Sequence, residues 1–179
     1  MNRLVPITKT EDIFPDFRDT SIGLLLEYHN LKRKYEEYSH ATLLIGMCMD
    51  NRKYLSIPEN FAYIMRTGGA NIRPYEFQIS YAIAVGKIRC IALIGHTDCG
   101  MSDLLSKREK FVSGLVEYGG WNTKDAKKHF DRSFSKFETG DEIDYTLTEV
   151  SQLRLKYPKV LVAPLFYKLE DNLIYQIKE

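Results

Sequence analysis

Two short apolar runs, each ending abruptly at a residue that can bind a metal, constrain the fold more than any other feature of this sequence. One run covers residues 43–47 and is followed by Cys48; the other covers residues 91–94 and is followed, after Gly95, by His96. Short apolar runs bounded by turn residues are typical of buried strands in a parallel sheet. Because ligands bind at the carboxyl ends of such strands, we expect both polar ends to lie at one edge of a sheet.

Similar patterns along the rest of the chain predict an α/β fold, in which a mainly parallel central sheet is flanked by helices. Strands are expected at residues 42–47, 61–65, 88–94, 160–167 and 173–177. Helices are expected at residues 22–38, 75–85, 101–118, 124–139 and 141–156, with Thr123 capping the fourth of them. The apolar positions of the third helix predict a buried side formed by Leu104, Leu105, Phe111, Leu115 and Val116.

The chain is expected to form a single domain over residues 1–179, because no linker, repeat or low-complexity segment divides it. Residues 1–40 would supply an N-terminal arm and helix, residues 41–105 the core of the site, and residues 106–179 a helical region with terminal strands. Residues 1–19 carry mixed charge and two prolines, which favours an extended arm over a core element.

The charge balance and the hydropathy pattern exclude several classes of partner. The chain has 25 Lys and Arg residues against 24 Asp and Glu residues, which gives no electrostatic case for binding nucleic acid or an anionic membrane. No apolar run approaches the roughly 20 residues of a membrane span, and the first residues lack the apolar core of a secretion signal. We therefore expect a cytoplasmic protein.

The three cysteines are an odd number and too few for a disulfide framework. Cys90 lies inside an expected strand and is interpreted as a buried, unreactive thiol. Cys48 and Cys99 would meet His96 if their strands are neighbours. Two thiolates and one imidazole suit zinc, and three protein ligands leave a fourth position open. Each residue alone would more often be a core thiol or a hydrogen-bonded loop histidine, so the prediction rests on their order and spacing.

Two spaced motifs resemble the β-class carbonic anhydrases, and in particular their short members. They are Cys48-x-Asp50-x-Arg52 and His96-x-x-Cys99-Gly100. The similarity extends in the same order over residues 41–105, and includes a glycine-rich loop at 66–69 and a helix containing Ser80-Tyr81-Ala82.

The resemblance implies one catalytic zinc per chain, held by Cys48, His96 and Cys99. It implies reversible hydration of CO2 to bicarbonate by zinc-bound hydroxide, since zinc can lower the pKa of its bound water to about 7. It also implies that the N-terminal arm and helix pack on a partner subunit, in a homodimer or a larger homo-oligomer, with the active site near that interface.

Asp50 and Arg52 match a dyad that lies beside the zinc in the family. Asp50 is two residues beyond Cys48, so on an extended segment it points to the same side. There its carboxylate can orient zinc hydroxide, and Arg52 can hold the carboxylate in a bidentate pair that keeps it off the metal. The same two residues are also compatible with a plain structural salt bridge.

The glycine-rich loop departs from the family pattern. It contains Arg66-Thr67-Gly68-Gly69, where the family usually has Arg-Asn-Ala-Gly. Thr67 is shorter than Asn and offers no amide donor, which affects the substrate pocket rather than the metal. Adjacent glycines let the backbone approach a ligand closely, so Gly68 and Gly69 are candidate substrate-binding residues, unless they form only a turn.

Other functions remain open on the same residues. The scaffold could instead hydrolyse CS2 or COS, or the protein could be non-catalytic with a structural zinc, for which Asp50 is the simplest fourth ligand. His40 and His129 are candidate proton shuttles that the sequence does not place near the metal. We interpret Phe130, Phe134 and Phe137 as core or dimer contacts. We interpret the basic runs 107–108 and 127–128 as solvated helix faces.

Overall fold

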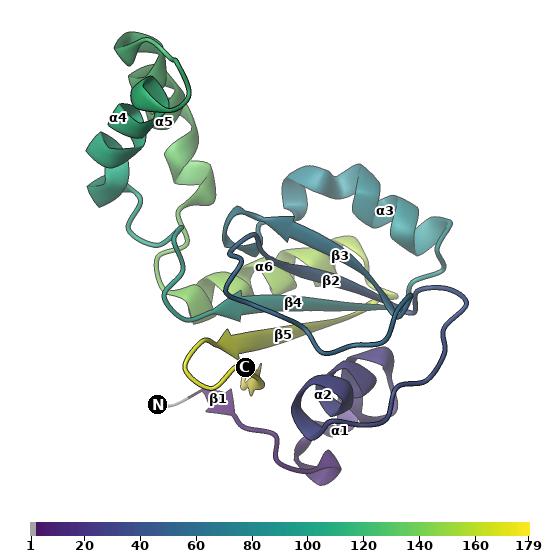
Figure 1. Ribbon diagram of the computed structural model, residues 1–179. Coiled ribbons are helices and arrows are strands. Elements are labelled where there is room, and N and C mark those ends of the chain that lie inside the picture. Colours follow the sequence, from purple (N-terminus) through teal and green to yellow (C-terminus); the bar gives the residue numbers. More distant parts are fainter. Residues whose placement is uncertain (1–2) are drawn as a thin grey trace.

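A six-stranded sheet lies at the centre of the computed structural model, which describes residues 3–179 (Figure 1). Its strand order is β1-β6-β5-β4-β2-β3. The four parallel strands are β2 (Leu43–Cys48), β3 (Ala62–Thr67), β4 (Cys90–His96) and β5 (Leu161–Lys168). The antiparallel strands at one edge are β6 (Leu173–Ile177) and β1 (Leu4–Val5). The predicted mainly parallel sheet is confirmed, and β2 and β4 are neighbours, as the predicted metal site requires.

Helices cover both faces of this sheet (Figure 1). One face is covered by α1 (Pro15–Arg18) and α2 (Ser21–Leu31), the other by α3 (Glu76–Ala84) and α6 (Glu142–Lys156). In β2, where successive side chains alternate between faces, Leu43 and Ile45 join the core under α2 while Leu44 joins the core under α3 and α6. Because both faces are buried, the central strands read as almost continuous apolar runs.

The N-terminal segment is a core element, and the extended arm predicted for residues 1–19 is wrong within residues 3–19. Its strand β1 pairs with β6, a short 3-10 helix η1 (Thr10–Asp12) follows, and Ile7, Ile13 and Phe17 are buried in the core of their own chain. Pro15 was interpreted as a sign of extended chain, but it is the first residue of α1, where its missing N–H costs no hydrogen bond. Residues 1 and 2 lie outside the described part, and packing on a partner subunit stays a prediction.

The helix predicted to reach residue 38 ends at Leu31. Thr20 caps its start by accepting hydrogen bonds from two backbone N–H groups of the first turn. Lys32 ends it by adopting a left-handed φ of 55°. The charged run at 32–37 has helical propensity but no apolar face to bury, so it continues as irregular chain.

Two further helices, α4 (Arg108–Glu117) and α5 (Thr123–Phe137), form a hairpin that projects from the end of the sheet (Figure 1). The helix predicted directly after Gly100 begins only at Arg108, after turns and a 3-10 segment η4 (Leu105–Lys107). Its predicted buried side is wrong in part: Leu105, Phe111 and Val116 are exposed, whereas Val112 is buried. Helix α4 packs on α5 instead of on the sheet, so only a narrow strip of it is covered. Asn122, not Thr123, caps α5.

The remaining predicted elements lie close to their expected positions. Short 3-10 segments at Gly68–Ala70 (η2) and Arg73–Tyr75 (η3) connect β3 to α3. Within residues 3–179, the helices are all too short or too polar to cross a membrane.

His29 connects α2 to two loops through a buried ring. Its Nδ1 accepts a hydrogen bond from the Ser56 N–H at 3.1 Å, and its Nε2 lies 2.9 Å from the Asn172 carbonyl oxygen, to which it must donate. Burial lowers the pKa of His29. In the unfolded chain the histidine pKa has its ordinary value of about 6.5. As the pH falls, the unfolded chain therefore binds a proton at a higher pH than the folded chain does. The stabilisation that depends on a neutral His29 is therefore fully present above that pH and decreases as the pH falls below it.

We expect the free energy of unfolding to fall between about pH 7.5 and pH 5, by about 1.4 kcal/mol for each unit by which burial lowers the pKa of His29. Urea denaturation at several pH values measures this. His29→Gln should remove most of the dependence, whereas His40→Gln, at an exposed histidine, should retain it. Equal pH slopes in the parent and in His29→Gln would show that His29 is not responsible.

Candidate metal centre

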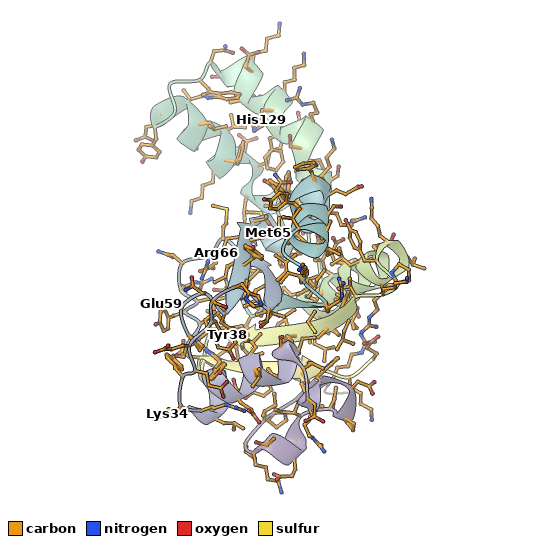
Figure 2. The ribbon with its side chains drawn as sticks, turned by 90° about the vertical axis from the view of Figure 1, so that its right-hand side faces the viewer. Lys34, Tyr38, Glu59, Met65, Arg66 and His129 are labelled. Carbon is orange, nitrogen blue, oxygen red and sulfur yellow. The ribbon has the colours of Figure 1, made fainter. Side chains whose placement is uncertain are left out.

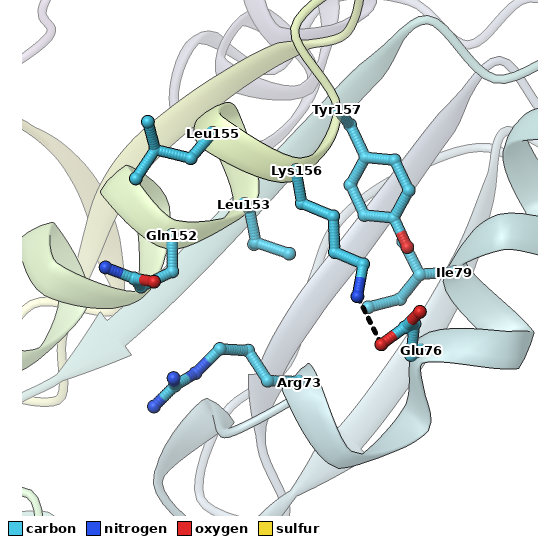
Figure 3. Close-up of a pocket in the computed structure, with 8 residues that line it drawn as sticks. All are labelled: Arg73, Glu76, Ile79, Gln152, Leu153, Leu155, Lys156 and Tyr157. Carbon is cyan, nitrogen blue, oxygen red and sulfur yellow. Dashed lines mark ion pairs between the residues drawn. The ribbon is translucent and has the colours of Figure 1, made fainter.

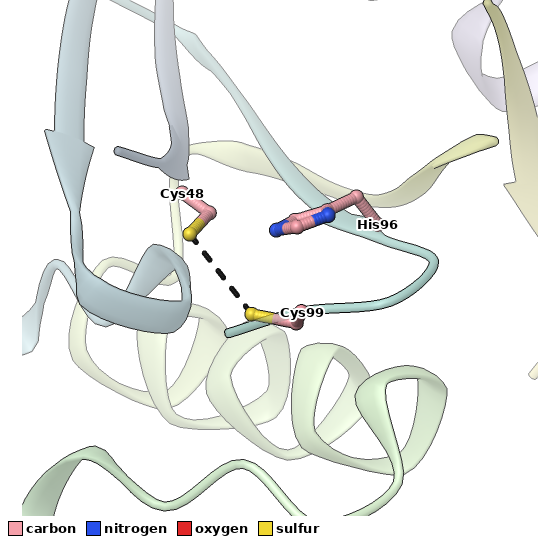
Figure 4. Close-up of side chains that lie close together, drawn as sticks. All are labelled: Cys48, His96 and Cys99. Atoms are coloured by element: carbon pink, nitrogen blue, oxygen red, sulfur yellow. Dashed lines mark hydrogen bonds between the residues drawn. The ribbon is translucent and has the colours of Figure 1, made fainter. Parts of the chain in front are cut away.

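The carboxyl ends of β2 and β4 bring the predicted metal ligands together. Cys48 is the last residue of β2 and His96 the last of β4. These strands are parallel neighbours, so both residues lie at the same edge of the sheet. Cys99 follows in the turn after His96, and Figure 4 shows the three side chains converging. Their ligand atoms all lie within 4.8 Å of one another, and all three residues are buried.

The three side chains fit a zinc ion. The sulfurs of Cys48 and Cys99 are 3.9 Å apart, and two sulfurs bound at about 2.3 Å to a tetrahedral zinc would lie about 3.8 Å apart. His96 Nδ1 lies 2.8 Å from the Thr97 carbonyl oxygen, to which it donates, so Nε2 carries the lone pair. That Nε2 is buried and has no hydrogen-bond partner among residues 3–179. A buried nitrogen lone pair needs either a hydrogen-bond donor or a Lewis acid, and a metal ion would be such a Lewis acid.

The two thiols are electrostatically unequal. The Cys99 thiol donates a hydrogen bond to the Cys48 sulfur, which lowers the pKa of Cys48 far below its ordinary value and raises the pKa of Cys99. Backbone hydrogen bonds from Asp50 and Gly69 also favour the Cys48 thiolate. One of the two ligands is therefore held ready as the thiolate that a metal requires.

Arg52 holds the Asp50 carboxylate, as the spacing predicts. Its Nε lies 3.1 Å from each carboxylate oxygen and its Nη2 lies 2.6 Å from Oδ2. This pairing keeps the pKa of Asp50 well below its usual range. Asp50 is therefore an ionised carboxylate next to the ligand cluster, and it is not itself a member of that cluster.

Three charged residues beside the site, Asp98, Lys53 and Glu142, were not among the predicted site residues. Glu142 Oε1 accepts a hydrogen bond from the Cys99 backbone N–H at 3.3 Å. Asp98 accepts a hydrogen bond from Arg52 at 2.7 Å. Lys53 is only 3% exposed, and its Nζ donates to the Asp50 carbonyl oxygen at 3.2 Å. Burial lowers the pKa of Lys53, and nearby negative groups oppose that shift. Asp98 stands between His96 and Cys99 in the sequence, which was an available signal. Lys53 offered none, because lysines are seldom buried.

The glycine-rich loop serves the site in two different ways. Gly69 has a φ of 62° and its backbone N–H faces the Cys48 sulfur. Gly68 instead contacts apolar side chains, since a Cβ there would meet the Met101 sulfur at 3.2 Å. Thr67 Oγ1 is buried and has no hydrogen-bond partner in the described chain. Substrate binding by the two glycines stays a prediction.

We expect Gly69→Ala to destabilise the protein by about 2 kcal/mol more than Gly120→Ala. Both glycines have a left-handed φ, 62° and 69°, so both variants bear about 1 kcal/mol of backbone strain. A Cβ at Gly69 would also lie 2.5 Å from Thr139 Cγ2, whereas nothing lies within 4 Å at Gly120. Urea denaturation measures both variants, and equal losses would show that the loop yields to the extra carbon.

An apolar hollow of about 280 Å³ lies between these loops and the α4–α5 hairpin. Its lining consists of Met49, Gly68, Met101, Leu104, Phe111, His129, Phe130, Ser133, Phe134 and Phe137. The aromatic stripe of α5, predicted to be core or dimer contact, thus lines a hollow beside the ligand loops. His129 lies on the hairpin (Figure 2), and the His40 ring pairs with Ser39. Neither histidine is part of the ligand cluster.

A second hollow, of about 410 Å³, lies between α3 and α6 (Figure 3). Its two cations are each paired with an acid. Arg73 Nη2 lies 2.7 Å from Glu149, and Lys156 forms an ion pair with Glu76. Because these charges balance, the hollow gives no electrostatic reason to bind an anion, and we assign it no function.

Comparison with solved structures finds the same arrangement of strands and helices in known enzymes. A β-carbonic anhydrase of Trichomonas vaginalis matches with a TM-score of 0.65 at 16% identity, over 83% of this chain and 90% of that chain. A carbonic anhydrase from Glaciozyma antarctica matches with a TM-score of 0.62 at 19% identity, over 95% and 99%. The fold is that of the β-carbonic anhydrases.

The same fold occurs in a carbon disulfide hydrolase, which matches with a TM-score of 0.57 at 19% identity, over 78% of this chain and 80% of that chain. Neither a protein-family model nor a curated protein sequence matches this chain. The resemblance indicated by the two motifs is thus confirmed for the β-carbonic anhydrase fold, while the activity has to be argued from the site.

Proposed function

We propose that this protein is a zinc-dependent carbonic anhydrase, which hydrates CO2 reversibly to bicarbonate. The observation that carries the proposal is the cluster of Cys48, His96 and Cys99 at the carboxyl ends of β2 and β4. A structural zinc site is closed by four protein ligands, whereas a catalytic one keeps a position open. Within residues 3–179 the cluster offers three ligands, and Arg52 holds the neighbouring Asp50 carboxylate in an ion pair.

The residues around the cluster have distinct tasks in this proposal. The two thiolates and His96 Nε2 would hold the zinc, which when bound supplies a Lewis acid that makes water reactive near neutral pH. The Thr97 carbonyl oxygen fixes the orientation of the His96 ring. Asp50 accepts a hydrogen bond from the attacking water and orients it, and Arg52 keeps the Asp50 carboxylate ionised and in place.

The apolar hollow supports a neutral, apolar substrate. It reaches the ligand loops at Met49, Gly68 and Met101. CO2 is uncharged and requires no ion pair to bind, so an apolar wall suits its approach. In this proposal the substrate lies beside Gly68, which lines the hollow. Gly69 would contribute only its backbone, because Thr139 fills the space where its Cβ would be.

Hydrolysis of COS or CS2 is the second candidate. The shared fold of a carbon disulfide hydrolase favours it, and so does the hollow, because both sulfur compounds are also neutral and apolar. One zinc-loaded preparation should be assayed for CO2 hydration and for release of hydrogen sulfide from COS and CS2. We expect the highest kcat/KM with CO2. Faster release of hydrogen sulfide would establish the second candidate, and no turnover of any of the three would indicate a structural zinc.

We also propose that the chain forms a homodimer or a larger homo-oligomer. Strand β3 is an edge of the sheet, and Tyr63, Ile64, Phe77 and Tyr81 expose apolar surface on or beside it. Open apolar edges of this kind favour association. Light scattering after gel filtration tests this, and a mass near the 20.8 kDa of one chain would contradict it.

A site built on free thiols also suits a reducing compartment such as the cytoplasm.

A further inference from the structure

Asp98 lies in the turn between His96 and Cys99 with a backbone φ of 54°. Glycine adopts this left-handed conformation without strain, whereas aspartate does so at a cost. Asp103 has a similar φ of 51°, although its carboxylate has no partner within residues 3–179, so the role of Asp98 has to be argued from the contacts of its side chain.

The Asp98 carboxylate is bound by the same guanidinium that holds Asp50. Arg52 Nη1 donates to Asp98 Oδ2 at 2.7 Å, and Nη2 donates to the Asp98 carbonyl oxygen at 2.8 Å. Another edge of the group, formed by Nε and Nη2, is paired with Asp50. Because a guanidinium is planar and rigid, Arg52 joins the loop that follows Cys48 at the end of β2 to the loop that follows His96 at the end of β4 and carries Cys99.

This link lies on the surface of the protein. The side chain of Asp98 is 79% exposed and that of Arg52 is 46% exposed. Exposed ion pairs contribute little to global stability. We therefore expect the link between Asp98 and Arg52 to affect the positions of the two loops and to change the free energy of unfolding little.

We propose that Asp98 is a positioning residue. By holding Arg52 from the second ligand loop, it keeps both loops closed over the cluster and fixes the Asp50 carboxylate in its two-point pair. Without the Asp98 carboxylate, Nη1 of Arg52 loses its acceptor, and Arg52 then joins the two loops only through the Nη2 bond to the Asp98 carbonyl oxygen. The expected effect on the rate rests on the proposed function, whereas the effect on the loops follows from the geometry alone.

Two variants test this role against a matched control. Asp98→Gly removes the carboxylate and relieves the backbone strain, and Asp98→Asn keeps an oxygen acceptor but removes the charge. Asp103→Gly is the control, because Asp103 is also exposed, has a φ of 51°, and its carboxylate makes no hydrogen bond or ion pair with residues 3–179.

The first readout needs no catalysis. After treatment with a chelator, alkylation of Cys48 and Cys99 by iodoacetamide is followed peptide by peptide, with the buried Cys90 as an internal reference. We expect Asp98→Gly to raise the rate at Cys48 and Cys99 about tenfold, at the lower end of the effects typical for residues that support metal ligands. The rate at Cys90 should stay unchanged, Asp98→Asn should have a smaller effect, and Asp103→Gly none.

The second readout asks whether Asp98 acts through Arg52. In zinc-loaded protein, Asp98→Gly should lower kcat/KM for CO2 about tenfold while zinc stays near one per chain. In an Arg52→Lys background the same change should cost nothing further, since the shared partner is already altered. Equal alkylation of the parent and both glycine variants would overturn the proposal, as would an equal rise at Cys90. If the parent does not hydrate CO2 but the alkylation pattern holds, the proposed function fails and the positioning role stands.

Discussion

Cys99→Ala should reduce bound zinc from one per chain to below about a tenth and should abolish CO2 hydration. The substitution leaves one sulfur and one imidazole, and two ligands do not hold zinc against dilution and washing. Metal analysis after gel filtration measures the zinc content, and stopped-flow kinetics measures the rate.

Cys90→Ala is the matched control for this experiment. Cys90 is also a buried free thiol, but it lies at the start of β4, at the opposite end from His96. We expect this variant to keep both zinc and activity. A Cys99→Ala protein that retained zinc in the same proportion as the parent would show that the cluster does not hold the metal.

Arg52→Ala should lower CO2 hydration about a hundredfold while the zinc content stays near one per chain. Arg52 touches no ligand atom, but it holds the Asp50 carboxylate at two points. Once released, this ionised group can take the open position on the metal and exclude water from it. Zinc content and hydration rate should be measured on the same samples.

The double variant Arg52→Ala/Asp50→Asn separates this explanation from a plain structural salt bridge. An amide competes poorly for zinc, so the double variant should be more active than Arg52→Ala alone, although it lacks both members of the pair. Equal activity of the double variant and Arg52→Ala would favour a structural pair, because either change alone already breaks it. Full activity of Arg52→Ala would remove Arg52 from the mechanism.

The cluster of Cys48, His96 and Cys99 could be predicted from the sequence because the positions of these residues depend on local features. Each apolar run fixes a strand, and parallel neighbours place the ends of two such strands together. Cys48 and His96 therefore needed only one tertiary assumption, that β2 and β4 are adjacent, and the strand order confirms it. The Asp50–Arg52 contact follows from a spacing of two residues and is observed as the spacing predicts.

The errors have the opposite cause, since they concern which surface of the fold, if any, a segment packs against. Periodicity alone did not show that α4 would pack on α5 rather than on the sheet, which leaves Phe111 and Leu105 exposed. Likewise, the charged run after Leu31 has helical propensity but finds no surface to cover. Lys53 was not predicted because its burial depends on the conformation of the loop after β2, which the sequence pattern does not show.

The most direct test is stopped-flow CO2 hydration by zinc-loaded protein between about pH 6 and pH 9. If Cys48, His96 and Cys99 form a catalytic centre, hydration should be fast, should rise with pH through an ionisation, and should scale with the zinc bound per chain. No hydration at any pH, in protein that carries one zinc per chain, would contradict the proposed function.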